Sequence, residues 1–287
     1  MRAAPRGRLN LEGGTTSAVS DVASDVPRAL SIAGSDSGGG AGIQADLKTF
    51  SALGVYGMTA VTAVTVQNTK GVSGYEELAP EVVADQIRAV ATDIGVDAAK
   101  TGMLASERII RAVVEALGEV RIPQLVVDPV FVSKHGHALL QEEAVDALKS
   151  ELLPLATLVT PNLHEAAGLV GFGVRSREDM ARASRALVAL GPRAVLVKGG
   201  HLEADRAADL FFDGERFEWL EAERIDTPNT HGTGCTLSAA IAAHLAKGAG
   251  LFEAVGAGKR FVTGAIRHSL PIGQGIGPVD PLWSTKG

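Results

Sequence analysis

A short glycine-containing segment near the end of the chain combines residue types that bind and transfer an anionic group. It reads Thr-His-Gly-Thr-Gly-Cys-Thr over residues 230–236 and opens a helical pattern over residues 233–247. Glycines at a helix start let consecutive N–H groups point at a ligand, and the helix dipole adds partial positive charge. We therefore expect Gly232, Thr233, Gly234 and Cys235 to form an anion hole.

The only cysteine of the chain, Cys235, falls in the first turn of that helix. A helix N-terminus favours the thiolate, so the sequence predicts a lowered pKa for this thiol. The alternative is a small buried apolar residue, which is common for a single cysteine. The neighbouring glycines favour the functional interpretation. One cysteine also excludes an intramolecular disulfide and a multi-cysteine metal site.

Four further polar residues could hold a metal ion or a phosphate. Asn162 and Glu165 share one face at the start of an expected helix, where Glu165 could hold Mg²⁺ through water with help from Asn162. The same spacing fits a capping box, which this segment taken alone favours. Lys198 ends an apolar strand and could reach a phosphate or extend into solvent. Asp128 ends a buried strand and needs a partner such as a cation.

Gln67 ends a long β-branched strand, and its amide offers a donor and an acceptor together. That pair matches the edge of an aminopyrimidine, although a hydrogen bond within a turn is the simpler alternative.

The segment 40–45 fits the dinucleotide fingerprint poorly, because its third small residue is alanine and no acidic residue ends a second strand. His135 and His137 have no further ligand near them in sequence, so no metal site is expected there.

Short apolar strands alternate with helices from Arg28 onward. Strands are expected over 29–33, 58–67, 96–101, 124–130, 157–160 and 194–198, with a hairpin of 208–213 and 216–220. Helices are expected over 42–53, 80–94, 106–117 with a cap at Ser106, 141–153, from 162, 177–190, 233–247 and 251–269. This alternation predicts an α/β fold with a largely parallel sheet covered on both faces.

In such a sheet ligands bind at the carboxyl ends of the strands. The residues that fall at these ends are Asp36, Gln67, Thr101, Asp128, Asn162 and Lys198. One crevice is therefore expected to collect them.

Composition narrows the class of protein. The 287 residues are 46% hydrophobic with a net charge of −6, which excludes a disordered chain and favours neither nucleic acid nor an anionic membrane as a partner. No apolar run is long enough to span a bilayer. Residues 1–27 have no periodic apolar pattern and no secretory signal, so we expect a mobile tail, with an arginine-containing transit peptide as the weaker alternative. Residues 28–287 are expected to form one domain.

Several segments together resemble the hydroxymethylpyrimidine/phosphomethylpyrimidine kinases of thiamine biosynthesis. The segments are 33–50, 62–69, 100–104, 127–130, 160–166, 197–201 and 229–241, in the order of that family. The resemblance implies a ribokinase-like three-layer αβα sandwich, ATP and Mg²⁺ as cofactors, a cytoplasmic location and a homodimer. It implies two reactions: phosphorylation of 4-amino-5-hydroxymethyl-2-methylpyrimidine to its monophosphate, and then to the diphosphate.

The resemblance also implies roles for single residues. The pyrimidine pocket would use Gly34, Asp46, Gln67, Met103 and Val130. Lys198 and Asp128 would face the phosphates and the metal, Asn162 and Glu165 would organise Mg²⁺, and Thr233 and Lys198 would contact the nucleotide. Gly232 to Cys235 would form the anion hole, with Cys235 as the base where the wider superfamily usually has aspartate.

Two other functions stay open on this sequence. A pyridoxal or pyridoxine kinase of the same fold acts on a similar six-membered nitrogen ring with a hydroxymethyl group. A non-catalytic pyrimidine-binding regulator would need the ring pocket but not the phosphate-binding residues. Residues 232–235, Lys198 and Glu165 therefore favour an enzyme.

Overall fold

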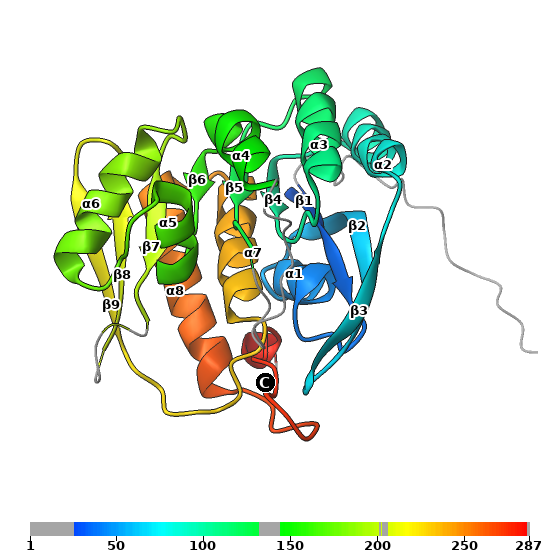
Figure 1. Ribbon diagram of the computed structural model, residues 1–287. Helices are drawn as coiled ribbons and strands as arrows, with labels where there is room; N and C mark the ends of the chain where they lie inside the picture. The colour runs from blue at the N-terminus through cyan, green and yellow to red at the C-terminus, as the bar shows by residue number, and fades with distance from the viewer. Residues whose placement is uncertain (1–25, 132–143, 201, 203–205, 286–287) are drawn as a thin grey trace, which may run out of the picture.

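The structure is a computed structural model that describes residues 26–131, 144–200, 202 and 206–285. Its centre is a nine-stranded sheet in the order β3-β2-β1-β4-β5-β6-β7-β8-β9 (Figure 1). The strands are β1 (Arg28–Asp36), β2 (Tyr56–Asn68), β3 (Gly71–Glu77), β4 (Ala98–Thr101), β5 (Leu125–Val127), β6 (Leu158–Val159), β7 (Val195–Lys198), β8 (Arg206–Phe212) and β9 (Phe217–Glu223). The six strands from β2 to β7 in this order run parallel, and β3, β8 and β9 are antiparallel to their neighbours.

Helices cover both faces of the sheet, so the expected three-layer αβα sandwich is confirmed. The helices are α1 (Gly42–Ala52), α2 (Pro80–Asp93), α3 (Glu107–Glu119), α4 (Ala144–Ala147), α5 (Leu163–Val170), α6 (Arg177–Val188), α7 (Thr233–Ala246) and α8 (Leu251–Arg267). Helices α2 to α6 pack on one face, and α1, α7 and α8 pack on the other (Figure 1). The two faces bury separate apolar clusters.

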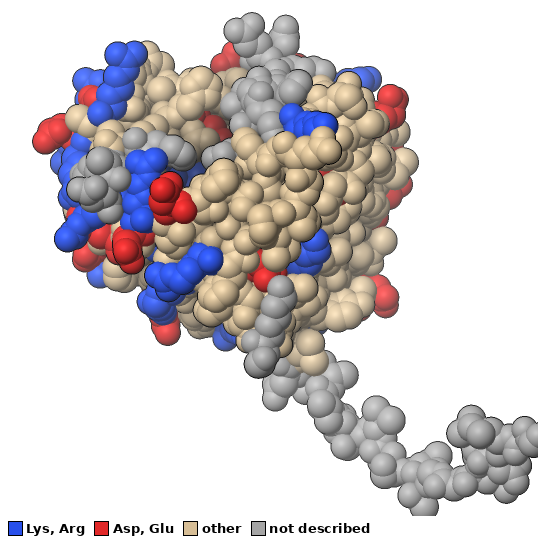
Figure 2. All heavy atoms as spheres, turned by 90° about the horizontal axis from the view of Figure 1, so that it is seen from below, with Lys and Arg blue, Asp and Glu red and all other residues tan. Residues whose placement is uncertain are grey.

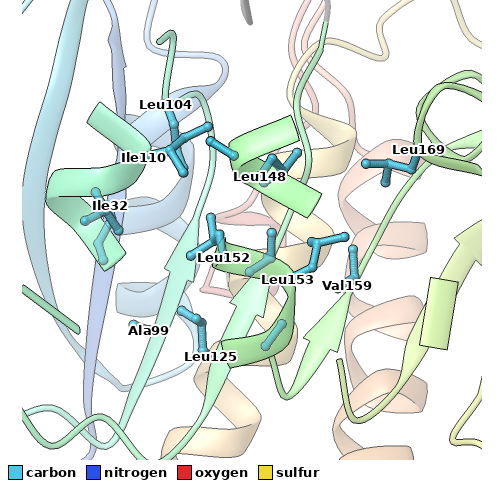
Figure 3. Close-up of a cluster of buried hydrophobic side chains, with 14 of the residues drawn as sticks. Ile32, Ala99, Leu104, Ile110, Leu125, Leu148, Leu152, Leu153, Val159 and Leu169 are labelled. Atoms are coloured by element: carbon cyan, nitrogen blue, oxygen red, sulfur yellow. The ribbon is translucent and has the colours of Figure 1, made fainter. Parts of the chain in front are cut away.

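The larger cluster holds the middle of the sheet rigid. Leu148, Leu152 and Leu153, which follow α4, are buried over the short strands β4, β5 and β6 (Figure 3). Truncating one such leucine to alanine costs about 2–5 kcal/mol of stability. The core therefore holds in place the strand ends from which the site residues project.

Most predicted elements are confirmed, with differences that have local causes. Of the helix expected over 141–153, residues 141–143 lie outside the described residues and Ala144–Ala147 is α-helical. A π turn (Leu148–Leu152) and a 3-10 turn (Leu153–Leu155) follow, because Pro154 lacks the N–H that an α-helix needs. Strand β3 was not predicted, since its Gly, Ser and Glu residues have weak strand propensity. Pairing with β2 holds it at the sheet edge. Ser106 precedes α3 but makes no capping bond, and its hydroxyl donates to Glu77 instead.

The segment between β9 and α7 runs along the bottom of the molecule as Figure 1 shows it, where α7 begins. Seen from below, charged side chains of both signs gather over the side built by α6, β8 and β9 (Figure 2). Oppositely charged side chains form ion pairs there, as between Arg177 and Glu221 at 2.7 Å.

Helices in the described part of the chain are too short or too polar to cross a membrane. Residues 1–25, His135 and His137 lie outside the described residues, so the predictions about them stay predictions.

Candidate active site

A cavity of about 540 Å³ opens at the carboxyl ends of the parallel strands. The predicted site residues that line it are Gly34, Asp36, Gln67, Met103, Asp128, Val130, Asn162, Glu165, Lys198, Gly232, Thr233, Gly234 and Cys235. Thr101 is fully buried and does not line it, although it also ends a strand. The sheet therefore collects residues from across the chain in one crevice, as the strand-end argument predicts.

Asp46 does not fit the predicted contact with a pyrimidine. Its side chain is 0% exposed and is absent from the cavity wall. Lys100 Nζ donates to both of its carboxylate oxygens at 3.0 and 3.1 Å, and Ser31 Oγ donates to one of them at 2.5 Å. Asp46 is therefore a buried partner of Lys100 behind the cavity, because helix α1 turns it toward the sheet.

The turn before α7 lines the cavity over residues 230–235, and within it the N–H of Thr233 donates to Thr230 O at 3.3 Å. Gly232 caps the helix with φ of +81°, a left-handed conformation that glycine adopts without steric cost. A Cβ atom at this position would lie 1.8 Å from the carbonyl oxygen of Gly40. At Gly234 an added Cβ would lie 3.5 Å from Lys198 Nζ and 3.6 Å from Asp128 Oδ2. The turn thus sits against the glycine loop after β1 and beside the charged residues of the site.

Cys235 is partly exposed to the cavity in the first turn of α7. Burial on its other sides raises the pKa of the thiol to about 11, while the positive charge of Lys100 acts in the opposite direction. Asp46 and Asp128 add to the rise. The predicted lowering of this pKa is therefore wrong, because removal of the sulfur from water outweighs the favourable charges around it.

Lys198 connects two acidic side chains on the cavity wall. Its Nζ lies 2.9 Å from Asp128 Oδ1 and 3.9 Å from Glu165 Oε2. Burial alone would raise the pKa of Asp128, but Lys198 and Lys100 together hold it below its usual value. Burial raises the pKa of Glu165 to about 7 against the opposing effect of Lys198. Lys198 is thus a cation inside the cavity rather than a solvated strand end.

Asn162 and Glu165 form the capping box that their spacing favours. The Asn162 side chain accepts from the N–H groups of His164 and Glu165, and Glu165 Oε2 accepts from the N–H of Asn162 at 2.7 Å. Glu165 nevertheless lines the cavity. The capping box is therefore confirmed, and the role of Glu165 as a metal ligand stays a prediction.

The donor set of the wall fits Mg²⁺ bound together with a phosphate ligand. Mg²⁺ is usually held by one or two carboxylates, waters and substrate phosphates rather than by a closed protein cage. Asp128 and Glu165 offer two carboxylates around one ammonium group. Within the described ranges no group of three or more His, Cys, Asp or Glu side chains could hold a metal ion by itself.

A second group of hydrogen-bonded side chains links Gln67 to residues 230–235, which we call the anion turn. His231 Nε2 lies 2.8 Å from Asp36 Oδ2 and 3.3 Å from Gln67 Nε2. A carboxylate only accepts, so this ring nitrogen carries a proton and cannot accept from an amide N–H. The nitrogen and the oxygen of the Gln67 amide must therefore exchange places, so that the oxygen faces His231. The amide nitrogen then donates to Thr65 Oγ1, which lies 3.0 Å from the amide group. The Thr65 hydroxyl is then free to donate to Ser35 O at 2.9 Å.

With this geometry in place, comparison with known proteins decides the family. The sequence profile of the phosphomethylpyrimidine kinase family matches residues 36–280. The chain belongs to that family.

The relatives of this kinase match nearly its whole length. It is 54% identical over 258 residues to a hydroxymethylpyrimidine/phosphomethylpyrimidine kinase of Streptomyces coelicolor, covering 90% of this chain and 95% of the relative. It is 55% identical over 260 residues to a kinase of the same description from Mycobacterium tuberculosis, covering 90% and 94%.

Solved structures confirm the ribokinase-like fold. An ADP complex of Bacillus subtilis pyridoxal kinase matches with a TM-score of 0.85 at 43% identity, over 91% of this chain and all of that one. Phosphomethylpyrimidine kinase from Clostridium difficile matches with a TM-score of 0.75 at 46% identity, over 83% and 99%.

Sequence reasoning missed three polar residues around the site of this kinase. His231 stands inside the glycine segment, but its pairing with Asp36 joins residues 195 positions apart and leaves no local signal. Lys100 and Lys259 lie within apolar or helical segments and are paired with buried aspartates. Their buried pairing could have been suspected from a charged residue inside a hydrophobic pattern.

Proposed function

We infer that this protein is a bifunctional hydroxymethylpyrimidine/phosphomethylpyrimidine kinase that uses ATP in thiamine biosynthesis. One observation carries this conclusion: Gln67, the candidate for pyrimidine recognition, contacts His231, and His231 directly precedes Gly232 of the anion turn. Recognition of a ring and stabilisation of a phosphoryl group therefore occur within one cavity. Membership of the family supports the same reaction.

For the transfer step we propose that the backbone N–H groups of residues 232–235 stabilise the oxygens of the migrating γ-phosphoryl group. Lys198, which already holds two acidic side chains, would shift its charge toward the phosphates as they bind. Mg²⁺ held by Asp128, Glu165 and the nucleotide would neutralise phosphate charge. Asn162 would act by holding Glu165, and Thr233 would lie beside the nucleotide.

In the first reaction the substrate hydroxyl must lose a proton as its oxygen attacks phosphorus. We propose that Cys235, as the thiolate, accepts this proton while the O–P bond forms and the bond between the γ-phosphorus and the bridging oxygen of ATP breaks, releasing ADP. The pKa of about 11 means that only a small fraction of the empty enzyme carries the thiolate at neutral pH. In the second reaction the monophosphate is already largely ionised, because its second pKa is about 6, so it needs this base far less.

We further propose Gly34, Met103 and Val130 as the apolar wall of the ring pocket. All three line the cavity, and a Cβ on Gly34 would lie 3.1 Å from the sulfur of Met103. The small residue at 34 leaves room for the methionine against the ring.

The testing experiment is product analysis after incubation with ATP, Mg²⁺ and the hydroxymethylpyrimidine. The expected result is the monophosphate followed by the diphosphate, with one ADP released for each step. Pyridoxal and pyridoxine are tested in parallel, because the structural match to a pyridoxal kinase favours that function as the second candidate. Faster phosphorylation of pyridoxal would favour the second candidate, and ring binding without any phosphorylated product would favour a regulator.

We also propose a cytoplasmic location, a homodimer and a single domain over residues 28–287. The first is supported by the dependence on ATP, and the third by one continuous sheet from β1 to β9. Gel filtration with light scattering tests the homodimer.

A further inference from the structure

A fully buried lysine, Lys100, lines the same cavity as the anion turn. Lys100 projects from β4 toward the face covered by α1 and α7, because it lies two residues after Ala98, which belongs to the apolar cluster on that face, and successive side chains of a strand point to opposite faces. Its side chain is 0% exposed, yet it reaches the cavity wall that Cys235 also lines. A Cβ atom on Gly102 would lie 2.9 Å from its Nζ, so the chain keeps space for the ammonium group.

Such a charge is costly to bury, and the structure holds it in one place. Asp46 of α1 receives two hydrogen bonds from Lys100 Nζ, at 3.0 and 3.1 Å, and Ser31 Oγ fixes the carboxylate from β1. Replacement of a buried ion pair by apolar residues is often neutral or stabilising, so stability alone is weak reason to keep this one. The alternative reason to keep the pair is that the positive charge of Lys100 has a role in the reaction.

We propose that Lys100, held by Asp46, is a positioning residue that supplies the counter-charge for the thiolate of Cys235. This inference rests on the proposed function, in which that thiolate accepts the substrate proton. Lys100 lies in the wall of the cavity with no exposed surface, and it acts from there through its charge. Asp46 keeps the ammonium group charged and aligned.

The charges around Cys235 set the expected direction. The titratable groups that act on it are Lys100 from β4, Asp46 from α1, Asp128 after β5 and Lys198 from β7. Among the charged neighbours, Lys100 has the largest effect and lowers the pKa of the thiol by more than Asp46 raises it. Loss of the whole pair should therefore leave the thiol harder to ionise.

The test uses the single cysteine of the chain as its own reporter. The rate of Cys235 alkylation by neutral iodoacetamide is measured from pH 7 to 10 in the full-length protein, without nucleotide. For Lys100→Met we expect a rate at pH 9 that is roughly tenfold lower, since one pKa unit changes the thiolate fraction tenfold. Lys259→Met is the matched control, because this lysine also lines the cavity and pairs with an aspartate, Asp209. Its alkylation profile should equal that of the wild type.

Lys100→Met leaves Asp46 buried without its cation and can fail to fold, so the double variant Asp46→Asn/Lys100→Met is measured as well. We expect a folded double variant, checked by circular dichroism, to be alkylated at least about threefold more slowly at pH 9. An unchanged or faster rate in either folded variant overturns the inference. Absence of phosphorylated pyrimidine from the wild type would overturn the proposed function instead, and the alkylation result does not depend on it.

Discussion

Replacing Gly232 by alanine should remove most of the activity of this kinase, and Gly248→Ala is a closely matched control. Both glycines have left-handed backbone conformations, with φ of +81° and +83°, and both flank α7. Alanine in this conformation costs about 1–2 kcal/mol at either position. The two variants therefore share the same backbone strain.

The surroundings of the two positions differ. An alanine Cβ at 232 would lie 1.8 Å from the carbonyl oxygen of Gly40, whereas at 248 no atom beyond the adjacent backbone would lie within 4 Å of it. Relief of the contact at 232 requires the turn or the loop to move by about 1 Å or more, a misplacement that can cost about a hundredfold in rate. We expect kcat to fall by about that factor in Gly232→Ala and to stay within about twofold of the wild type in Gly248→Ala.

The assay couples ADP release to phosphorylation of the hydroxymethylpyrimidine, and thermal unfolding is followed in parallel. Gly248→Ala should lower Tm by roughly 2–8 °C, as expected for 1–2 kcal/mol in a chain of this size. Equal kcat values in the two variants would refute the argument that the close approach of Gly232 to Gly40 holds the anion hole in shape.

Three other predictions follow from the site. Cys235→Ala should slow the first phosphorylation by at least about a hundredfold and the second much less, measured by single-substrate kinetics; equal losses would remove the role of Cys235 as a base. Gln67→Ala should raise the Kd of the pyrimidine roughly tenfold while the Kd of ATP, measured by calorimetry, stays unchanged, and an unaltered pyrimidine Kd would contradict the assignment. Burial would raise the pKa of Asp36, but hydrogen bonds from His231 and the glycine loop outweigh burial and lower this pKa. The ionised Asp36 therefore stabilises the fold above about pH 4, and this stabilisation is lost as the pH falls. The difference in unfolding free energy between pH 6 and pH 3, measured with urea, should accordingly be smaller in Asp36→Asn than in the wild type.

Much of the site could be predicted from the sequence because parallel strands end at one edge of the sheet. That rule alone places Gln67, Asp128 and Lys198 together, although they are far apart in the chain. The helix start at Gly232 was predictable for a local reason, since two closely spaced glycines precede an apolar helical pattern.

The errors share one physical origin. Asp46 matches a family segment, but no local pattern shows that its side chain turns away from the cavity toward Lys100. The thiol of Cys235 sits at a helix start, but whether the helix dipole or desolvation dominates depends on how many atoms of other segments surround the sulfur.

The order of strands and helices, the glycine turns and the identity of the polar strand ends follow from the sequence by itself, because they depend on periodicity and on residues adjacent in the chain. Only the tertiary structure decided which charges pair, as His231 does with Asp36 and Lys100 does with Asp46, and which side chains face the cavity. Those properties depend on distances between segments and on exclusion of water, and neither quantity is encoded in any short stretch of residues.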